Sequence, residues 1–552
     1  LSHSQKKLIK NEIISFELSG VALNKKQKSR FKAIQSKLSK LSSSFDENIL
    51  DSMNNFKLVI SDKNLLKGIP DHVVKSALLK AKAKKTKGFL FTIDFPSYLP
   101  IMQYADNRKL RKDIYTAYNT KASSLMDSKF DNTKNINHIL KLKYEMSKLL
   151  GYSDISSMLL KTKMAKSSEE VISFLSKLTK KATKSALADI DDINDIAKEF
   201  NIAKVMPWDI PYLSEKLKKK EFSITDEEIK QYFSVNNVLQ GLFNICKKIY
   251  GLNINETKVS TWHEDVKFFE IFNKEKQLVG KFYLDLYARK EKRGGAWMDE
   301  AISKYKFMNE EESPVAYLTC NFTPPSNGKA HLTHDEVITL FHEFGHGLHH
   351  LLTEVTEYSI SGIKGVEWDA VELPSQFMEN YCWEWSVIRD MSYNKRTNSY
   401  MPKKLFNNLL ESKNFQSGLQ TLRQVEFALF DIKLHREYSP KNRSFMKILN
   451  NVKAQVSVIN TPTWNKFPHS FSHIFSGGYA SAYYSYKWAE VLSADAYSLF
   501  EEIGILSKTA GNKFKKEILS KGGSRTAMES FIAFRGRKPK INALLTHHGL
   551  TN

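Results

Sequence analysis

Cysteine is scarce in this chain: only Cys246, Cys320 and Cys382 occur among its 552 residues. They lie far apart, so they provide neither the spacing of a disulfide framework nor the ligand pairs of a cysteine-based zinc site. Long apolar runs are lacking as well, since none approaches the ~18 residues that a membrane-spanning helix needs. We therefore expect a protein of a reducing compartment, the cytoplasm, without a membrane partner.

Acidic residues are too few to balance the basic ones. Lysine and arginine total 83 against 60 aspartates and glutamates, which gives a formal net charge of +23. Such an excess is compatible with a nucleic-acid partner. However, the lysine clusters in residues 80–87 and 216–220 are not accompanied by arginines or by interleaved aromatic residues. A solvated surface explains them better, so we expect no nucleic-acid partner and keep a basic nucleic-acid-binding protein only as an alternative.

The chain divides into two regions by its periodicity. Residues 1–205 predict one helix after another without a fixed-period repeat, which argues against a solenoid. Pro207 and Pro211 then interrupt the pattern and indicate a boundary. We expect an N-terminal helical region at residues 1–205 and a second region, which contains the motif described below, at residues 206–552. Because the chain begins without methionine, we also expect further sequence before residue 1, with room for a removed targeting segment.

Two segments of the second region predict β-strands. In residues 281–287 apolar residues alternate with more polar ones, as on a half-buried strand. Residues 315–322 form a second candidate, which stops at Pro324 and Pro325 and suits a strand near the edge of a sheet. After residue 332 the pattern is helical again. The sequence therefore predicts a mainly α protein with one small β-sheet.

One helical segment carries the residues of a metal site. Thr333 and Glu336 form a T-x-x-E capping box, which predicts that a helix begins there. His342 and His346 are four positions apart, so both rings project from one face and can bind one Zn²⁺ at ~2.0–2.1 Å. Glu343 completes the H-E-x-x-H pattern of metallopeptidases, in which the glutamate acts as general base. The alternative is a structural helix with two surface histidines.

Two glycines in the same segment strengthen the metal-site interpretation. Gly345 and Gly347 each cost a helix ~1 kcal/mol relative to alanine. We therefore expect another part of the chain to approach this helix closely.

A catalytic zinc usually takes a third protein ligand. His349 is the nearest candidate, but it lies about 10.5 Å along the helix axis from His342, too far for both to bind one ion comfortably. A carboxylate from a following helix is geometrically easier, and within residues 369–380 we favour Glu372. From its position alone, Glu372 is equally well explained as an acidic residue that interacts with a helix N-terminus.

Several runs of sequence together carry a family resemblance. At the metal motif these are HEFGHGLHHLLT and SGIKGVEWDAVELPSQFMEN; elsewhere they are FELSG at residues 16–20, WDIPYLSEKL at 208–217, KFYLDLYAR at 281–289, FSHIFSGGYASAYYSYKWAEVLSADA at 471–496 and FRGRKP at 534–539. Over essentially its whole length the chain resembles the thimet-oligopeptidase family of zinc metallopeptidases (gluzincins), and in particular the bacterial branch of that family.

This resemblance implies a fold and a ligand. The family's fold is a two-lobed, mainly helical body around a deep channel, with the site at the channel floor, where it admits unfolded oligopeptides but not folded proteins. The family's third zinc ligand corresponds to Glu372. Family chains usually begin earlier, with more helical sequence before FELSG, so we expect that part of the N-terminal region precedes residue 1.

A run of tyrosines is a second candidate for chemistry. Tyr479, Tyr483 and Tyr486 are spaced as on one face of a helix, just after Gly477 and Gly478. Spacing alone favours a packed aromatic stripe. Phenols can also donate hydrogen bonds to a developing oxyanion, and glycines allow a segment to move over substrate.

The resemblance favours a function for this tyrosine run, because in the family the region contacts substrate and stabilises the transition state. Including the histidine that corresponds to His473, we expect catalytic roles for Tyr479, Tyr486 and His473, and substrate-binding roles for Tyr483, Gly477 and Gly478.

Together these observations predict a zinc-dependent endopeptidase that acts on short peptides. One zinc ion per chain would be held by His342, His346 and Glu372, although Mn²⁺ or Co²⁺ suits the same ligands. Glu343 would take a proton from the attacking water. The strand at residues 315–322 would pair with an extended peptide. We expect a monomer, and a dipeptidyl carboxypeptidase of the same superfamily is the alternative.

Overall fold

The computed structural model of the chain describes residues 1–289, 292–325 and 330–550, and helices dominate it. The helices up to residue 250 are α1 (His3–Leu18), α2 (Lys25–Asn55), α3 (Asp71–Ala83), α4 (Phe95–Tyr104), α5 (Arg108–Thr120), α6 (Thr133–Leu149), α7 (Ile155–Leu159), α8 (Ser168–Glu199), α9 (Ile210–Phe222), α10 (Asp226–Lys230) and α11 (Val235–Tyr250). The later helices are α12 (His334–Leu351), α13 (Leu373–Glu379), α14 (Trp385–Met391), α15 (Lys403–Glu411), α16 (Ser417–Glu437), α17 (Phe445–Val456), α18 (Ser472–Phe475), α19 (Ser485–Ile503), α20 (Lys508–Glu517), α21 (Ala527–Arg535) and α22 (Asn542–His547).

The strands lie mostly between α11 and α12. They are β1 (Leu58–Ile60), β2 (Phe89–Phe91), β3 (Asn253–Glu256), β4 (Lys267–Phe272), β5 (Leu278–Tyr287), β6 (Trp297–Ile302), β7 (Tyr305–Phe307), β8 (Glu310–Glu312), β9 (Val315–Phe322), β10 (Tyr393–Asn394) and β11 (Ser399–Tyr400). The largest sheet has the order β3-β4-β5-β9-β6, in which only β5 and β9 run parallel. The expectation of a single sheet was wrong, because β1–β2, β7–β8 and β10–β11 form three further two-stranded ladders.

Strand β9 is internal, not the edge strand that pairs with a peptide. It is hydrogen-bonded to β5 on one side and to β6 on the other, so its backbone groups are already paired. The prediction that this strand adds a substrate strand was therefore wrong. Pro324 and Pro325 lie beyond the end of the strand and do not affect its pairing. The edge on this side belongs to β6.

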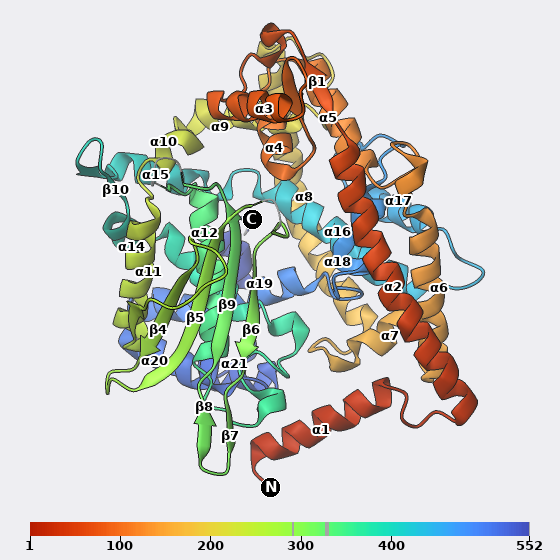
Figure 1. Cartoon of the computed structure of the whole chain (residues 1–552), viewed down its shortest axis with the longest axis vertical. Coiled ribbons are helices and arrows are strands. Elements are labelled where there is room, and N and C mark those ends of the chain that lie inside the picture. The colour runs from red at the N-terminus through yellow and green to blue at the C-terminus, as the bar shows by residue number, and fades with distance from the viewer. Residues whose placement is uncertain (290–291, 326–329, 551–552) are drawn as a thin grey trace.

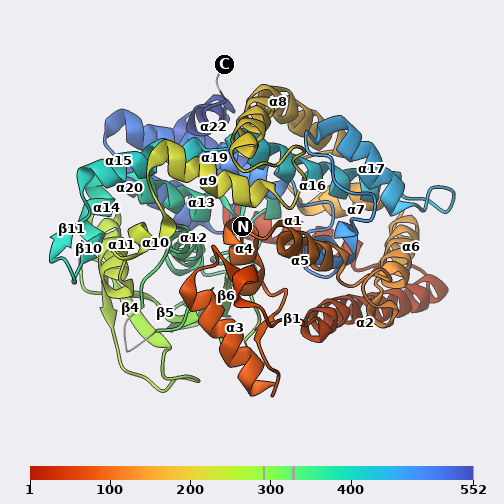
Figure 2. The ribbon, with the colours of Figure 1, turned by 90° about the horizontal axis from the view of Figure 1, so that it is seen from above.

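The elements form two groups, on the left and on the right of Figure 1. The left group contains the large sheet with α11, α12, α14 and α20, whereas the right group contains α2, α6, α7 and α17. Figure 2 shows the same arrangement from above, with α14, α15 and α20 on one side and α6, α7 and α17 on the other. This agrees with the expected two-lobed helical body.

Two large hydrophobic cores hold these groups together, and each combines helices from distant parts of the chain. One core joins α11, the sheet, α12 and α13 with α20 and α21. The other joins α6, α8 and α9 with α16 and α17, which come much later in the chain. Helix α19 contributes to both cores, through Leu492 and Phe500 to the first and Ala494 to the second. A smaller third core lies under α3, α4 and α5.

Helix α12 begins where the capping box predicts. Thr333 is its N-cap: the Thr333 side chain accepts the N–H of Glu336, and the Glu336 carboxylate accepts the N–H of Thr333. The helix lies against β9 on one side and against α13 on the other. Because it is covered on both sides, most of its side chains are buried, including Glu343 and His346.

Candidate active site

Helices α12 and α13 cross at Gly345. A Cβ atom there would lie 2.5 Å from the carbonyl oxygen of Pro374 and 2.6 Å from Cα of Ser375, so only glycine permits this approach. On the side of the sheet, a Cβ at Gly347 would lie 3.1 Å from Cδ2 of Leu318 in β9. The close approach expected at these glycines is confirmed, and it comes from α13 and from the sheet.

The crossing brings three potential metal ligands together. Nε2 of His342 and Nε2 of His346 lie 3.2 Å and 3.0 Å from Oε2 of Glu372. The three groups offer donor atoms that all lie within 4.8 Å of one another. Ligands at ~2.0–2.1 Å from a tetrahedral ion are separated by ~3.4 Å. Two imidazole nitrogens and a carboxylate oxygen at this spacing therefore fit Zn²⁺ and leave a fourth position for water or substrate.

His349 does not join this group of donors. Its side chain is buried, and burial lowers the pKa of its imidazole to about 3. Its Nδ1 has no hydrogen-bond partner among the residues that the structure describes. His349 is therefore a core residue of α12, in keeping with the distance along the helix axis.

Two further side chains orient the donors. Nδ1 of His342 lies 2.6 Å from Oε1 of Glu379, and Oγ of Ser375 donates to Oε2 of Glu372 at 3.0 Å. A carboxylate behind a metal-binding histidine fixes the ring and makes it a better ligand. Sequence reasoning missed Glu379, although it lies seven residues after Glu372, two helical turns along the same face.

The carboxylates and imidazoles perturb one another strongly. Burial would lower the pKa of His342, but hydrogen bonds to Glu372 and Glu379 outweigh it and raise that pKa well above its usual value. Burial acts to raise the pKa of Glu372, yet the neighbouring His346 and His342 hold it well below its usual range. Glu372 is therefore an anion, as a metal ligand must be.

Glu343 is buried beside the donors. Only 5% of the residue is exposed, and its Oε2 accepts no hydrogen bond within the described part of the chain. Burial raises the pKa of this carboxyl, against the opposing effect of His342 and His346. An unpaired, desolvated carboxyl next to a cluster of ligands is typical of a functional group rather than a structural one.

The tyrosine run is not the continuous helix that its spacing predicts. Helix α19 begins only at Ser485, so Tyr479 and Tyr483 lie in a turn and only Tyr486 is helical. The turn contains Ser481, whose φ of +54° cannot belong to a right-handed helix. The helical prediction for residues 479–484 was therefore wrong.

The rings of this run nevertheless meet. Tyr479 and Tyr486 stack with their centroids 5.2 Å apart, and the ring of Tyr483 meets that of Tyr486 edge-on at 5.2 Å. The imidazole of His473 contacts all three rings at 5.4–6.3 Å. The phenol of Tyr479 donates to Oε1 of Glu372 at 3.3 Å, which places the cluster beside the metal ligands.

Burial keeps these phenols protonated. It raises the pKa of Tyr479 and of Tyr486, and the charge of Glu372 raises both further. Burial also raises the pKa of Tyr483 to about 12. All three hydroxyls are therefore hydrogen-bond donors at neutral pH.

Two glycines join His473 to the tyrosines. Gly478 has φ +84° and nothing near its missing Cβ, whereas a Cβ at Gly477 would lie 3.2 Å from Cα of His473. The N–H of Tyr479 donates to the carbonyl oxygen of His473 at 2.8 Å and closes the loop. The glycines thus permit a tight turn that brings His473 and Tyr479 side by side.

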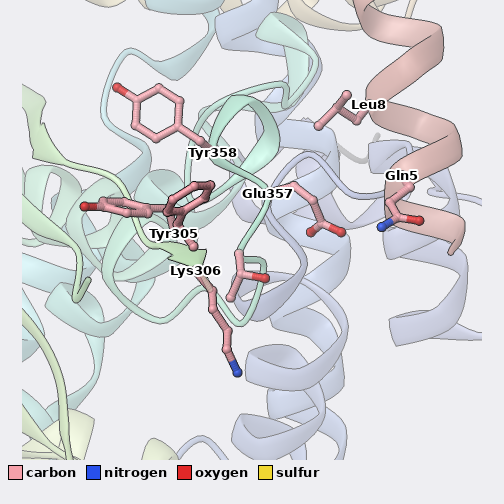
Figure 3. A pocket seen from close by; sticks show the side chains of 8 residues that line it. Gln5, Leu8, Tyr305, Lys306, Glu357 and Tyr358 are labelled. Carbon is pink, nitrogen blue, oxygen red and sulfur yellow. The ribbon is translucent and has the colours of Figure 1, made fainter. Parts of the chain in front are cut away.

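A cavity of about 680 Å³ lies elsewhere, between α1 and the β7–β8 hairpin (Figure 3). The side chains labelled there are Gln5, Leu8, Tyr305, Lys306, Glu357 and Tyr358. None of the metal-ligand candidates lines it, so this cavity is separate from the donor cluster.

Comparison with known proteins shows the family of the chain. The family described as "Peptidase family M3" matches residues 101–550, which include both helices of the donor cluster and the tyrosine run. The chain belongs to peptidase family M3. This M3 peptidase is 46% identical over 557 residues to oligopeptidase A of Salmonella typhimurium, an alignment that covers 100% of the chain and 82% of the relative.

More distant relatives extend the comparison. The M3 peptidase is 28% identical over 548 residues to the dipeptidyl carboxypeptidase of Escherichia coli, across 97% of the chain and 79% of the relative. Its fold is similar to the solved structure of PZ peptidase A with an inhibitor: the TM-score is 0.57 at 15% identity, with 97% and 78% of the two chains covered.

The family confirms several expectations from the sequence. The M3 peptidase is a zinc metallopeptidase, with a mainly helical fold and a histidine-histidine-glutamate donor group. In the part of the chain that the structure describes, no helix has the length and apolar character needed to cross a membrane.

Proposed function

We propose that this M3 peptidase is an endopeptidase that cleaves short, unfolded peptides in the cytoplasm, as a monomer with one zinc ion per chain. The observation that carries the proposal is the convergence of His342, His346 and Glu372 beside Glu343, whose Oε2 accepts no hydrogen bond from the described residues. The Salmonella relative is named oligopeptidase A, which supports peptides as the substrates.

His342, His346 and Glu372 would hold the metal, and Glu379 would keep the ring of His342 in place. The chemistry that zinc supplies when bound is to polarise the scissile carbonyl and to make a water molecule acidic. Glu343 acts as the general base, taking a proton from the attacking water and returning it to the leaving amine. The raised pKa of this buried carboxyl suits a group that must both accept and donate a proton.

Tyr479 and Tyr486 act as donors to the oxyanion that develops on the scissile carbonyl. Both phenols are protonated, and the hydroxyl of Tyr479 already reaches Glu372. Such donors act most strongly in the transition state, where the negative charge develops. His473, which is exposed and contacts the rings of Tyr479 and Tyr486, assists in stabilising the oxyanion.

Substrate binding involves the same segment and one strand. Tyr483, Gly477 and Gly478 contact the peptide near the scissile bond. Strand β6 is the outer strand of its sheet, and no other strand of the described residues pairs with its outer edge, so an extended peptide adds to it by main-chain hydrogen bonds.

The N-terminal helical region, residues 1–205, and the catalytic region, residues 206–552, together enclose a channel that leads to the site. An enclosed site of this kind excludes folded proteins.

The test is a digest of a mixed peptide library analysed by mass spectrometry, with and without a zinc chelator. We expect internal cleavages that the chelator abolishes. A peptide and its C-terminally amidated twin should be cleaved at equal rates, because an endopeptidase does not need a free carboxylate. Cleavage that is restricted to C-terminal dipeptides and blocked by the amide would instead establish a dipeptidyl carboxypeptidase.

A further inference from the structure

The turn that carries the tyrosines is attached to a buried aspartate on α16. Oδ1 of Asp431 accepts the backbone N–H of Ser481 at 2.9 Å, and Oδ2 accepts that of Tyr483 at 2.9 Å. The side chain of Asp431 is fully buried. A carboxylate removed from water needs N–H or O–H donors for its lone pairs, and Asp431 takes two from this one turn.

A histidine on the same helix completes the environment of this carboxylate. Nδ1 of His435, one turn after Asp431, lies 2.9 Å from its Oδ1. His435 is fully buried, and its Nε2 has no hydrogen-bond partner among the described residues. The charge of Lys143 on α6 is also close enough to interact with Asp431. His435, on the same helix, thus contacts the carboxylate of Asp431, and the carboxylate accepts two N–H groups of the turn.

The turn is fixed on its other sides as well. Ser481 adopts the left-handed φ of +54°, and its Oγ lies 2.9 Å from Oγ of Ser156 on α7. The phenol of Tyr484 donates to Oδ2 of Asp369 at 2.7 Å, three residues before Glu372. The turn therefore bridges α16 and the segment that leads into the metal cluster.

We propose that Asp431 is a positioning residue for the reaction: by holding the N–H groups of Ser481 and Tyr483, it directs the phenols of Tyr479 and Tyr486 at the scissile carbonyl. This inference rests on the proposed role of those two phenols as oxyanion donors. Asp431 itself is not one of the potential metal ligands. It acts by fixing the backbone from which the donors project, so that they need no reorganisation during the reaction.

Asp431→Asn tests the proposal, because it keeps the size of the side chain but replaces one acceptor oxygen with a donor. We expect kcat to fall about 10- to 100-fold, as for a small misplacement of catalytic groups, with KM and zinc content nearly unchanged. Hydrogen–deuterium exchange of the amides at residues 479–485 should become faster than in the unmodified enzyme. If the variant does not fold, Asp431→Glu, which keeps both acceptors but displaces them, should show the same changes to a smaller degree.

A double-mutant cycle distinguishes a positioning role of Asp431 from a role in protein stability alone. In a background that carries Tyr479→Phe and Tyr486→Phe, Asp431→Asn should lower kcat by less than about threefold, because the hydroxyls that it positions are already absent. Asp209→Asn is the matched control: Asp209 is equally buried but pairs with Arg108 and Arg111. We expect it to lower stability while kcat stays normal.

The positioning role of Asp431 and the oxyanion role of the two phenols can fail separately. If Asp431→Asn keeps full turnover and slow exchange while the two phenylalanine substitutions abolish turnover, Asp431 is not a positioning residue. The inference would also be overturned if Asp431→Asn lowered kcat in the background with both phenylalanine substitutions as much as it does in the unmodified enzyme. Full activity of the doubly substituted phenylalanine variant would refute the oxyanion role, and the inference would fail with it.

Discussion

The crossing of α12 and α13 at Gly345 makes the metal site sensitive to a single methyl group. In Gly345→Ala the new Cβ would start 2.5 Å from the oxygen of Pro374 and 2.6 Å from Cα of Ser375. Non-bonded carbon atoms settle at about 3.5–4.0 Å, so the two backbones must separate by ~1 Å. Both neighbours are backbone atoms, which cannot rotate away.

The separation has two effects of different size. Overpacking costs about 1–3 kcal/mol, and alanine returns ~1 kcal/mol of helix propensity. The net loss of unfolding free energy is therefore modest. Glu372, however, immediately precedes α13 and moves with it, whereas metal–ligand distances tolerate only about 0.2 Å. We expect zinc affinity to fall about 10-fold or more, because the loss of a residue that only supports a zinc ligand already lowers affinity by about that factor.

The assay is competition for zinc with a chromogenic chelator, combined with thermal unfolding and with turnover at increasing free zinc. Turnover should recover partly at high zinc. Gly347→Ala is the matched control: its Cβ would meet only the flexible end of the Leu318 side chain, at 3.1 Å, so zinc affinity should be normal. If Gly345→Ala binds zinc as tightly as the unmodified enzyme, the helix crossing does not set the ligand geometry.

Three further outcomes follow from the site. Glu379→Ala should weaken zinc binding about 10- to 100-fold by freeing the ring of His342, as measured by chelator competition; unchanged affinity would remove Glu379 from the site. Tyr486→Phe should lower kcat by ~10²–10³ with KM, stability and zinc content nearly unchanged; a loss of stability instead of turnover would make the tyrosine a packing residue. A short peptide should be cleaved while the same sequence inside a tightly folded domain survives, as followed by mass spectrometry; rapid cleavage in the folded domain would contradict an enclosed site.

The two histidine ligands, His342 and His346, could be predicted from sequence because both lie on one helix. The capping box at Thr333 and the four-residue spacing of His342 and His346 depend only on helix geometry, and the structure reproduces both. Helix geometry favoured Glu372 as the third ligand, but only the family resemblance distinguished a ligand from an acidic residue at a helix N-terminus, because the position of Glu372 depends on how α13 packs on α12. Gly345 signalled that packing without identifying the partner.

Other features could not be predicted because long-range contacts override local pattern. The tyrosine spacing suits a helix. However, Asp431, some fifty residues earlier in the chain, accepts two N–H groups of the turn, and the helix begins only at Ser485. Strand β9 ends at prolines like an edge strand, yet its pairing is decided by β6, which joins it from the other side.

Zinc content and turnover, measured together in Glu343→Gln and Glu372→Gln, test the roles of these two glutamates most directly. The amide of Glu343→Gln cannot accept a proton, so this variant should retain one zinc per chain and lose most of its turnover. Glu372→Gln replaces an anionic ligand with a neutral one, so it should lose zinc and turnover together. Full turnover of Glu343→Gln, or normal zinc content in Glu372→Gln, would contradict the assignment of base and ligand.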